Sequence, residues 1–139
     1  MTEPQFFATP GYGPWMLENR HYHQAVRIGD RVDISGQGGW DDQLTFPESI
    51  EEEIVRAFDN VERTLATAGA TWRDVVSVDS FHVSDSPDVL GEVHGEVMIE
   101  QFRKRMGDRS PIWTMIGVAM LAAPNMRVEI RVTAVVGRT

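Results

Sequence analysis

Two early segments of the chain, residues 22–28 and 31–37, carry strand-like runs of hydrophobic and polar residues. Gly29 and Asp30 separate the runs, and a Gly/Asp pair of this kind closes tight hairpins. The pattern therefore predicts a β-hairpin. A later run rich in β-branched residues, from Val75 to Val83, predicts a third strand.

A helical repeat lies between the hairpin and that third strand. Its apolar residues recur at the spacing of one helical face, at positions 50, 54, 58, 61 and 65. Ser49 and Glu52 fit an N-terminal capping box, and Gly69 fits a left-handed C-terminal cap. These signals predict a helix with a defined beginning and end.

A second helix and two more strands complete the pattern. Ser86 is placed as the helix N-cap with Pro87 at the first helical position, and the helix is predicted to end near Gly107. His82 and His94 are expected at a strand end and on a helix surface. Residues 112–121 and 126–136 are then predicted to be strands joined by a turn.

In the last strand Val128, Ile130 and Val132 alternate with polar residues, so one face should meet the helices and the other should be polar. The element order is β-β-α-β-α-β-β. It predicts an α+β fold in which one mixed β-sheet carries two helices on one face. A polar face on the final strand indicates a solvated cavity or an oligomer interface.

Residues 1–20 hold three prolines and two glycines, which disfavour both a helix and a central strand. The segment is predicted to be an extended N-terminal arm, with residues 21–139 forming a single domain. Four aromatic residues of the arm would be costly to leave in water, so they are expected to pack on the body or on a neighbouring subunit. They are Phe6, Phe7, Tyr12 and Trp15.

Charge and composition exclude several classes of function. The formal net charge of −8 opposes binding to a phosphate backbone, so no nucleic-acid partner is expected. The absence of cysteine excludes disulfides, thiolate catalysis and cysteine-ligated metals. The chain begins without the features of a signal peptide and has no apolar run of about 20 residues, so we expect a cytoplasmic protein without a membrane partner.

Short motifs recur along the chain in an order and spacing that are more specific than any one of them. They are Ser35-Gly36-Gln37, Phe58-Asp59-Asn60-Val61, Ala68-Gly69-Ala70, Asp74-Val75-Val76, Pro111, Gly117-Val118, Leu121 and Val128-Glu129-Ile130. Together with the element order they resemble the RidA/YjgF (YER057c) family, from about residue 22 to residue 135.

The resemblance implies a chorismate-mutase-like α+β subunit that forms a homotrimer, with small-molecule pockets at the subunit boundaries. It also implies hydrolysis of enamines and imines without a metal or cofactor. In archetypal members, an arginine on the strand after the second helix binds the substrate carboxylate. A glutamate on the last strand positions the attacking water.

Carried over residue by residue, the family pattern is only partly present. Glu129 matches the water-positioning glutamate, Gly36 the pocket glycine and Tyr22 the pocket tyrosine. The arginine is missing: Trp113 stands in its place, followed by Thr114 and by Met115, where many members have a cysteine. Glu96, or Gly95 beside it, falls near the position of the pocket asparagine. The chain is therefore interpreted as a divergent member.

Replacement of the arginine changes the expected ligand. An indole offers one N–H donor and no charge, so it cannot bind a carboxylate as a guanidinium does. Hydrolysis of small 2-imino acids, as by a standard 2-iminobutyrate/2-iminopropanoate deaminase, is not expected. Trp113 would instead supply a flat apolar wall for an aromatic or less polar ligand. Arg109, Arg127 and Arg131 are the candidates for a substitute cation.

Several residues have a structural interpretation beside the functional one. Glu129 is either an acid/base group or a member of an ion pair with Arg127 and Arg131. Trp113 is either a pocket wall or buried at the trimer seam, and Trp40 is either a loop lid over the pocket or a core residue. His21 and His23 share one side of a predicted strand but lack further ligands, so no metal site is expected.

The favoured function is an enzyme in which Glu129 acts through a bound water on an imine, enamine or enol. Tyr22 would orient the ligand, Trp113 would stack on it, and backbone N–H groups near Gly36 or Thr114 would stabilise an oxyanion. Hydrolysis, tautomerisation and a lyase step all remain open. The alternatives are a non-catalytic trimer that binds a small ligand, and a purely structural role.

Overall fold

The computed structural model describes residues 3–87 and 93–137. The strands are β1 (Gln5–Phe7), β2 (Ala25–Ile28), β3 (Arg31–Ile34), β4 (Gln37–Gly38), β5 (Val75–His82), β6 (Ile112–Gly117) and β7 (Val128–Val135). The helices are α1 (Gly13–Arg20), α2 (Ile50–Thr67) and α3 (Val93–Met106), with a 3₁₀ turn η1 (Trp72–Asp74) before β5.

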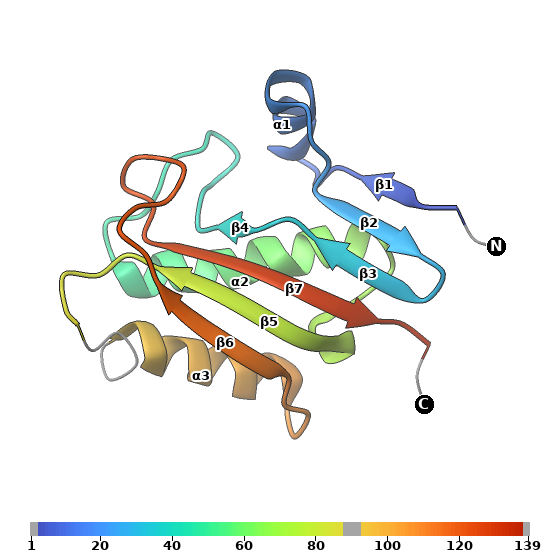
Figure 1. Cartoon of the computed structure of the whole chain (residues 1–139). Coiled ribbons are helices and arrows are strands. Elements are labelled where there is room, and N and C mark those ends of the chain that lie inside the picture. The colour runs from blue at the N-terminus through green and yellow to red at the C-terminus, as the bar shows by residue number, and fades with distance from the viewer. Residues whose placement is uncertain (1–2, 88–92, 138–139) are drawn as a thin grey trace.

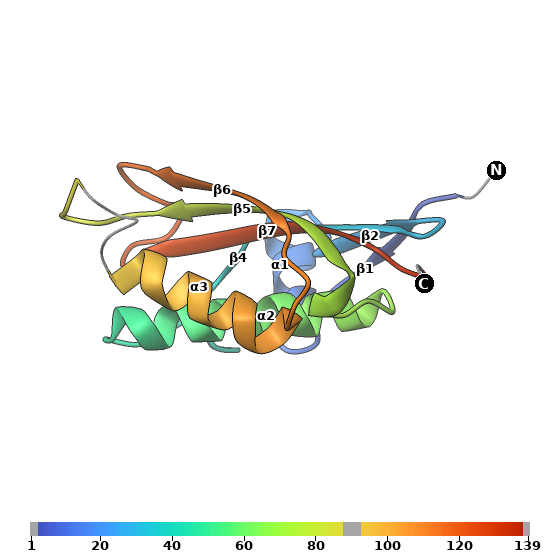
Figure 2. The ribbon, with the colours of Figure 1, turned by 90° about the horizontal axis from the view of Figure 1, so that it is seen from below.

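The strands form one mixed sheet in the order β1-β2-β3-β7-β5-β6, with β4 pairing beside β3 on β7 (Figure 1). β5 and β6 run parallel, and the other neighbours are antiparallel. Figure 2 shows α2 and α3 side by side on the same face of the sheet. The predicted α+β class, with a mixed sheet and two helices on one face, is confirmed.

The signals that delimit the elements act as the sequence predicts. Gly29, with φ of 63°, lies at the turn of the β2–β3 hairpin. The Ser49 side chain accepts a hydrogen bond of 3.3 Å from the Glu52 N–H at the start of α2, and Gly69 adopts φ of 80° just past its end. The predicted N-cap at Ser86 is not tested, because the residues that follow Pro87, up to position 92, lie outside the described part; α3 is described from Val93.

The core lies between α2, α3 and the helix-facing side of the sheet. The apolar face of α2 is fully buried at Ile54, Phe58, Val61 and Leu65. On β7, Val128, Ile130 and Val132 are buried with them, as their alternation predicts. The polar residues between them on β7 therefore face away from the two helices.

The N-terminal segment is not an extended arm. Residues 5–7 form the edge strand β1, paired only with β2, and residues 13–20 form the helix α1. The prolines were the misleading signal, because Pro14 occupies the first turn of α1, where a proline removes no helical hydrogen bond. The aromatic residues of the segment divide: Tyr12 is buried and Phe7 packs on the core, while Phe6 and Trp15 stay largely exposed.

Within the described residues, no helix is long and apolar enough to cross a bilayer.

Candidate functional site

Four of the residues predicted for the site line one cavity of about 270 Å³, which we call the Glu129 cavity. They are Tyr22, Gly36, Trp40 and Glu129. Its walls come from α1, the turn after β3, the loop after β4, the connection between β6 and β7, and β7 itself. The other lining residues are Trp15, Met16, Arg20, Leu44, Phe46, Ala122, Ala123 and Met126.

Glu129 is the acidic residue of this cavity. Its side chain lies against Gly36 so closely that a Cβ at position 36 would overlap the carboxylate. Any larger residue at position 36 would therefore force the Glu129 side chain to move. Burial among apolar side chains raises the pKa of the Glu129 carboxyl above its ordinary value, and the positive charge of Arg131 opposes part of that rise. Such a group accepts and donates protons closer to neutral pH than an exposed glutamate.

The two arginines that flank Glu129 in the sequence pair with other acids. Arg131 binds Asp79 at 3.0 Å, and Arg127 binds Glu53 at 2.8 Å. Within residues 3–87 and 93–137, Glu129 forms no ion pair. The ion-pair interpretation of Glu129 is thus not supported in this chain, and the carboxylate is left for a ligand or water.

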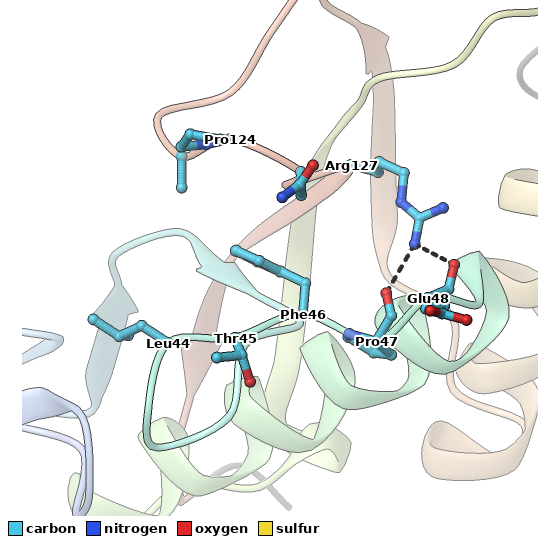
Figure 3. Close-up of a pocket in the computed structure, with 9 residues that line it drawn as sticks. Leu44, Thr45, Phe46, Pro47, Glu48, Pro124 and Arg127 are labelled. Atoms are coloured by element: carbon cyan, nitrogen blue, oxygen red, sulfur yellow. Dashed lines mark hydrogen bonds between the residues drawn. The ribbon is translucent and has the colours of Figure 1, made fainter.

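Arg127 lies in a second, larger cavity of about 700 Å³, which we call the Arg127 groove (Figure 3). Its guanidinium donates to the carbonyl oxygens of Pro47 and Glu48 at 3.1 and 3.0 Å and to the fully buried Glu53 carboxylate. A buried carboxylate left without this partner would be strongly destabilising. Arg127 is therefore committed to holding the loop before α2, and it is not a free cation for a ligand.

A buried polar network joins segments that carry walls of the Glu129 cavity to the body of the chain. The Tyr12 hydroxyl donates to Gln37 Oε1 at 2.5 Å, and Gln37 Nε2 donates to Gln24 Oε1 at 3.0 Å. The Thr9 and Thr64 hydroxyls, 2.7 Å apart, extend it to α2. The network fixes the segment leading into α1 and the short strand β4 to the body, so both walls of the cavity are held in place.

Trp40 is a core residue that also contributes to the cavity wall. Only 6% of it is exposed, and its ring packs edge-on against Tyr12 with 5.5 Å between ring centroids. It belongs to a small hydrophobic cluster with Tyr12, Met16 and Met126, separate from the main core. The structure therefore favours the core interpretation of Trp40 over a loop lid.

Tyr22 lies between α1 and β2, exposed and at the mouth of the same cavity. His21 and His23 do not form the strand pair that their spacing indicated. His21 is the left-handed C-cap of α1, whereas His23 packs against Phe6, and β2 begins only at Ala25.

The remaining predicted residues lie elsewhere on the chain. Trp113 on β6 is in register with Val78 of β5 and Val132 of β7, both buried under the helices, so its side chain shares the helix-covered face. Met115 has the same strand parity. Thr114 is exposed on the opposite face, and Glu96 is exposed on α3.

Trp113 is packed into the interior of the chain. Its ring packs edge-on against Phe102 of α3 at 5.1 Å, and its indole N–H donates to Ser80 Oγ at 2.9 Å. Glu129 is in register with Phe81 and Ile116 on the other face of the sheet. In the described part of the chain, therefore, Trp113 and Glu129 do not share a cavity.

Ser80 continues this hydrogen-bonded chain to two histidines. His82 Nε2 lies 2.8 Å from Ser80 Oγ, and His82 Nδ1 lies 2.9 Å from His94 Nδ1. Burial, reinforced by the neighbouring His94, lowers the pKa of His82 to about 3. His82 does end a strand as predicted, but His94 is buried between α3 and the sheet instead of lying on a helix surface. No sequence motif indicates this hydrogen-bonded chain, because its residues come from three separate elements, β5, α3 and β6.

Comparison with known proteins shows which family this fold and sequence represent. A family model described as Endoribonuclease L-PSP matches residues 16–136. The RutC family protein YjgH of Escherichia coli K12 is 32% identical over 83% of this chain and 84% of its own length. A 2-iminobutanoate/2-iminopropanoate deaminase of Dermatophagoides farinae is 35% identical over 83% of this chain and 85% of its own length.

Solved structures agree with these relatives. A structure of a protein YjgH covers 96% of both chains with a TM-score of 0.77 and 29% identity. A member of the YjgF/YER057c/UK114 family from Mycobacterium tuberculosis has the same TM-score, with 27% identity over 96% of this chain and all of the other. These structures thus share the mixed α+β fold of this chain, as the family resemblance implies. The chain belongs to the Endoribonuclease L-PSP family, which is the RidA/YjgF family.

Proposed function

We propose that this protein is a RidA-like enzyme that uses Glu129 for acid/base chemistry on an imine, enamine or enol of modest size. In this proposal it acts as a cytoplasmic homotrimer, without a metal or cofactor, and the Glu129 cavity is completed by an adjoining subunit. It differs from a standard 2-iminobutyrate/2-iminopropanoate deaminase because Trp113 replaces the arginine that would bind a small carboxylate.

One observation carries the proposal. Glu129 is a carboxylate with a raised pKa, without an ion pair in the described chain, at the edge of an apolar cavity that Gly36 keeps open. Perturbed acids in cavities of this kind are candidates for proton transfer. The deaminase among the relatives supports imine hydrolysis as the reaction class.

Hydrolysis would proceed in two balanced steps. The substrate reacts as its iminium ion, C=NH2⁺. Glu129 takes a proton from a water molecule while the water oxygen bonds to the iminium carbon and the C=N π electrons move to nitrogen, giving a neutral carbinolamine. Glu129 then returns this proton to the nitrogen. The C–N bond breaks and ammonia leaves, while the hydroxyl proton passes to the Glu129 carboxylate and the carbon becomes a carbonyl; that proton is then released with ammonia as ammonium. Tyr22, at the mouth of the cavity, would orient the substrate.

The open edge of the sheet supports a site completed by an adjoining subunit, whereas the packing of Trp113 inside its own chain leaves that residue out of the site. Trp113, Met115 and Glu96 cannot reach the Glu129 cavity of their own chain, because the sheet lies between them. β6 is an edge strand, and it exposes Ile112 and Ile116 on its open face. Exposed apolar residues on an unpaired edge strand favour association with another subunit.

The test is an assay with imines generated in place from amino acids. Ammonia release is followed with 2-iminobutyrate and with 2-imino-3-phenylpropanoate for the wild type, for Glu129→Gln and for Glu51→Gln, a matched change at an exposed residue of α2. We expect acceleration mainly of the aromatic imine, lost in E129Q by about 100-fold or more and kept in E51Q. Equal rates for wild type and E129Q would refute the proposal.

A second function is favoured by Trp113 itself. Its indole occupies the arginine position and its N–H is already bonded to Ser80, so no substrate clamp exists on β6 in the described chain. A trimer that binds a small ligand without turning it over would fit this observation. Stoichiometric binding of an imine analogue, with no acceleration of any imine in the assay above, would select this alternative.

A further inference from the structure

Arg20 is the only cationic residue among those that line the Glu129 cavity, all of which lie in the described part of the chain. It is the last residue of α1, so its position depends on the helix that the sequence did not predict. The cavity therefore combines one carboxylate, on β7, with one guanidinium, on α1. Arg127 and Arg131, which flank Glu129 in the sequence, do not line this cavity and pair with other acids.

The guanidinium of Arg20 is held without being neutralised. Its carbon lies 5.0 Å from the centroid of the Trp15 ring, five residues earlier on α1, and Trp15 lines the same cavity. Its one hydrogen bond to the described chain is a long contact of 3.5 Å with the Asn19 carbonyl, and no acidic residue there pairs with it. An arginine stacked on an aromatic face keeps its in-plane N–H donors free for an acid.

We propose that Arg20 binds the carboxylate of the substrate, in place of the arginine that Trp113 replaces on β6. This rests on the function proposed above and narrows its substrate class. Apart from Arg20, Glu129 and Tyr22, the side chains of the cavity are apolar or aromatic, among them Met16, Phe46 and Trp40. The substrate is therefore a small 2-imino acid with an aromatic or bulky apolar side chain, its carboxylate on Arg20 and its imine carbon facing Glu129.

Arg20 also has a purely structural role to be separated from this one. A cation in the last turn of a helix interacts favourably with the helix dipole. That role predicts a small loss of stability when Arg20 is changed. It predicts no difference between a charged and an uncharged ligand, and this difference is the readout that separates the two roles.

The experiment measures binding of 3-phenylpropanoate and of its uncharged amide, 3-phenylpropanamide, by calorimetry. The proteins are the wild-type oligomer, Arg20→Met, Arg20→Lys and Arg103→Met, the last removing the same charge from an exposed position on α3. We expect the wild type and R103M to prefer the acid. R20M should bind the acid about 10- to 100-fold more weakly and the amide unchanged, with R20K between them. Preserved preference for the acid in R20M, or no binding of the acid to the wild type, overturns the proposal.

A kinetic arm separates this inference from the proposed function. With 2-imino-3-phenylpropanoate, R20M should raise KM more than it lowers kcat, whereas E129Q should lower kcat and still bind 3-phenylpropanoate. Arg20-dependent binding without hydrolysis would support the carboxylate site and reject the enzyme. Hydrolysis that depends on Glu129 but not on Arg20 would reject the carboxylate site and support the enzyme.

Discussion

Glu129 is the residue whose ionisation should govern activity. As a general base it works when deprotonated, so kcat/KM should rise with pH through a pKa that burial places above the ordinary 4.5. Arg131→Met should move this acidic limb to still higher pH, because the lost positive charge is the one that lowers the pKa. The pH profiles of the two proteins measure the shift. An acidic limb of the kcat/KM profile below pH 4.5, or a limb that Arg131→Met does not move, contradicts the role of Glu129 as the general base.

Alanine substitutions at Gly36 and Gly39 should distinguish an effect on activity from an effect on folding. A Cβ at Gly36 would meet only the Glu129 side chain, which can turn away, so Gly36→Ala should lower the rate about 10- to 100-fold with little loss of stability. A Cβ at Gly39 would overlap the backbone carbonyl of Glu53 in α2, which cannot yield easily. Gly39→Ala should therefore cost about 1–3 kcal/mol of unfolding free energy.

Urea unfolding and the imine assay on both glycine variants provide the measurement. A stable, fully active Gly36→Ala protein would show that the close approach to Glu129 has no catalytic importance.

At the scale of elements, the sequence predicted most of the fold but not α1. Ser49, Gly69 and the alternation in β7 act locally, so their signals could be interpreted without knowledge of the rest of the chain. Pro14 was ambiguous, since proline breaks a helix interior but is tolerated in the first turn. Because the sequence pattern does not reveal α1, it gives no reason to place Trp15 and Arg20 beside Glu129.

The hydrogen-bonded chain through His82 joins three elements, β5, β6 and α3, and makes stability depend on pH. The unfolded chain protonates this histidine below about pH 6.5, while the folded chain does so only near pH 3. The contribution of His82 to stability is therefore fully present above about pH 6.5 and is lost as the pH drops toward 3, by at most about 1.4 kcal/mol per pH unit.

The variant His82→Gln should flatten this dependence, and His23→Gln, at an exposed position, should not. Unfolding free energies from urea titrations at pH 7 and pH 5 give the comparison. If the unfolding free energy of His82→Gln changes between pH 7 and pH 5 as much as that of the wild type, His82 binds protons equally in the folded and unfolded states, and its pKa is not lowered by folding.

At the scale of the whole molecule, the family resemblance allowed Tyr22, Gly36 and Glu129 to be assigned to one site, and they do share a cavity. The resemblance could not show that Trp113 packs inside its own chain. A family motif does not tell which contacts stabilise a side chain that replaces the family's usual residue. The contact with Phe102 and the bond to Ser80 decide that.

For the assembly, we predict that subunits associate through the edge strand β6. Ile112→Glu places a charge on an edge-strand residue that is 73% exposed in the single chain. The monomer should still fold, but light scattering should show loss of the trimer, and imine hydrolysis should fall with it. Ile28→Glu, at the exposed hairpin turn, is the control. A wild type that is monomeric, or an I112E protein that remains trimeric, contradicts the shared site.

The ratio of kcat/KM for 2-imino-3-phenylpropanoate between the wild type and Glu129→Gln, measured where the wild-type rate no longer changes with pH, tests the central claim most directly. Proton transfer by this carboxylate predicts a ratio of about 100 or more, with 3-phenylpropanoate still bound by the variant. A ratio near one, with the wild type active, would place the chemistry on another residue.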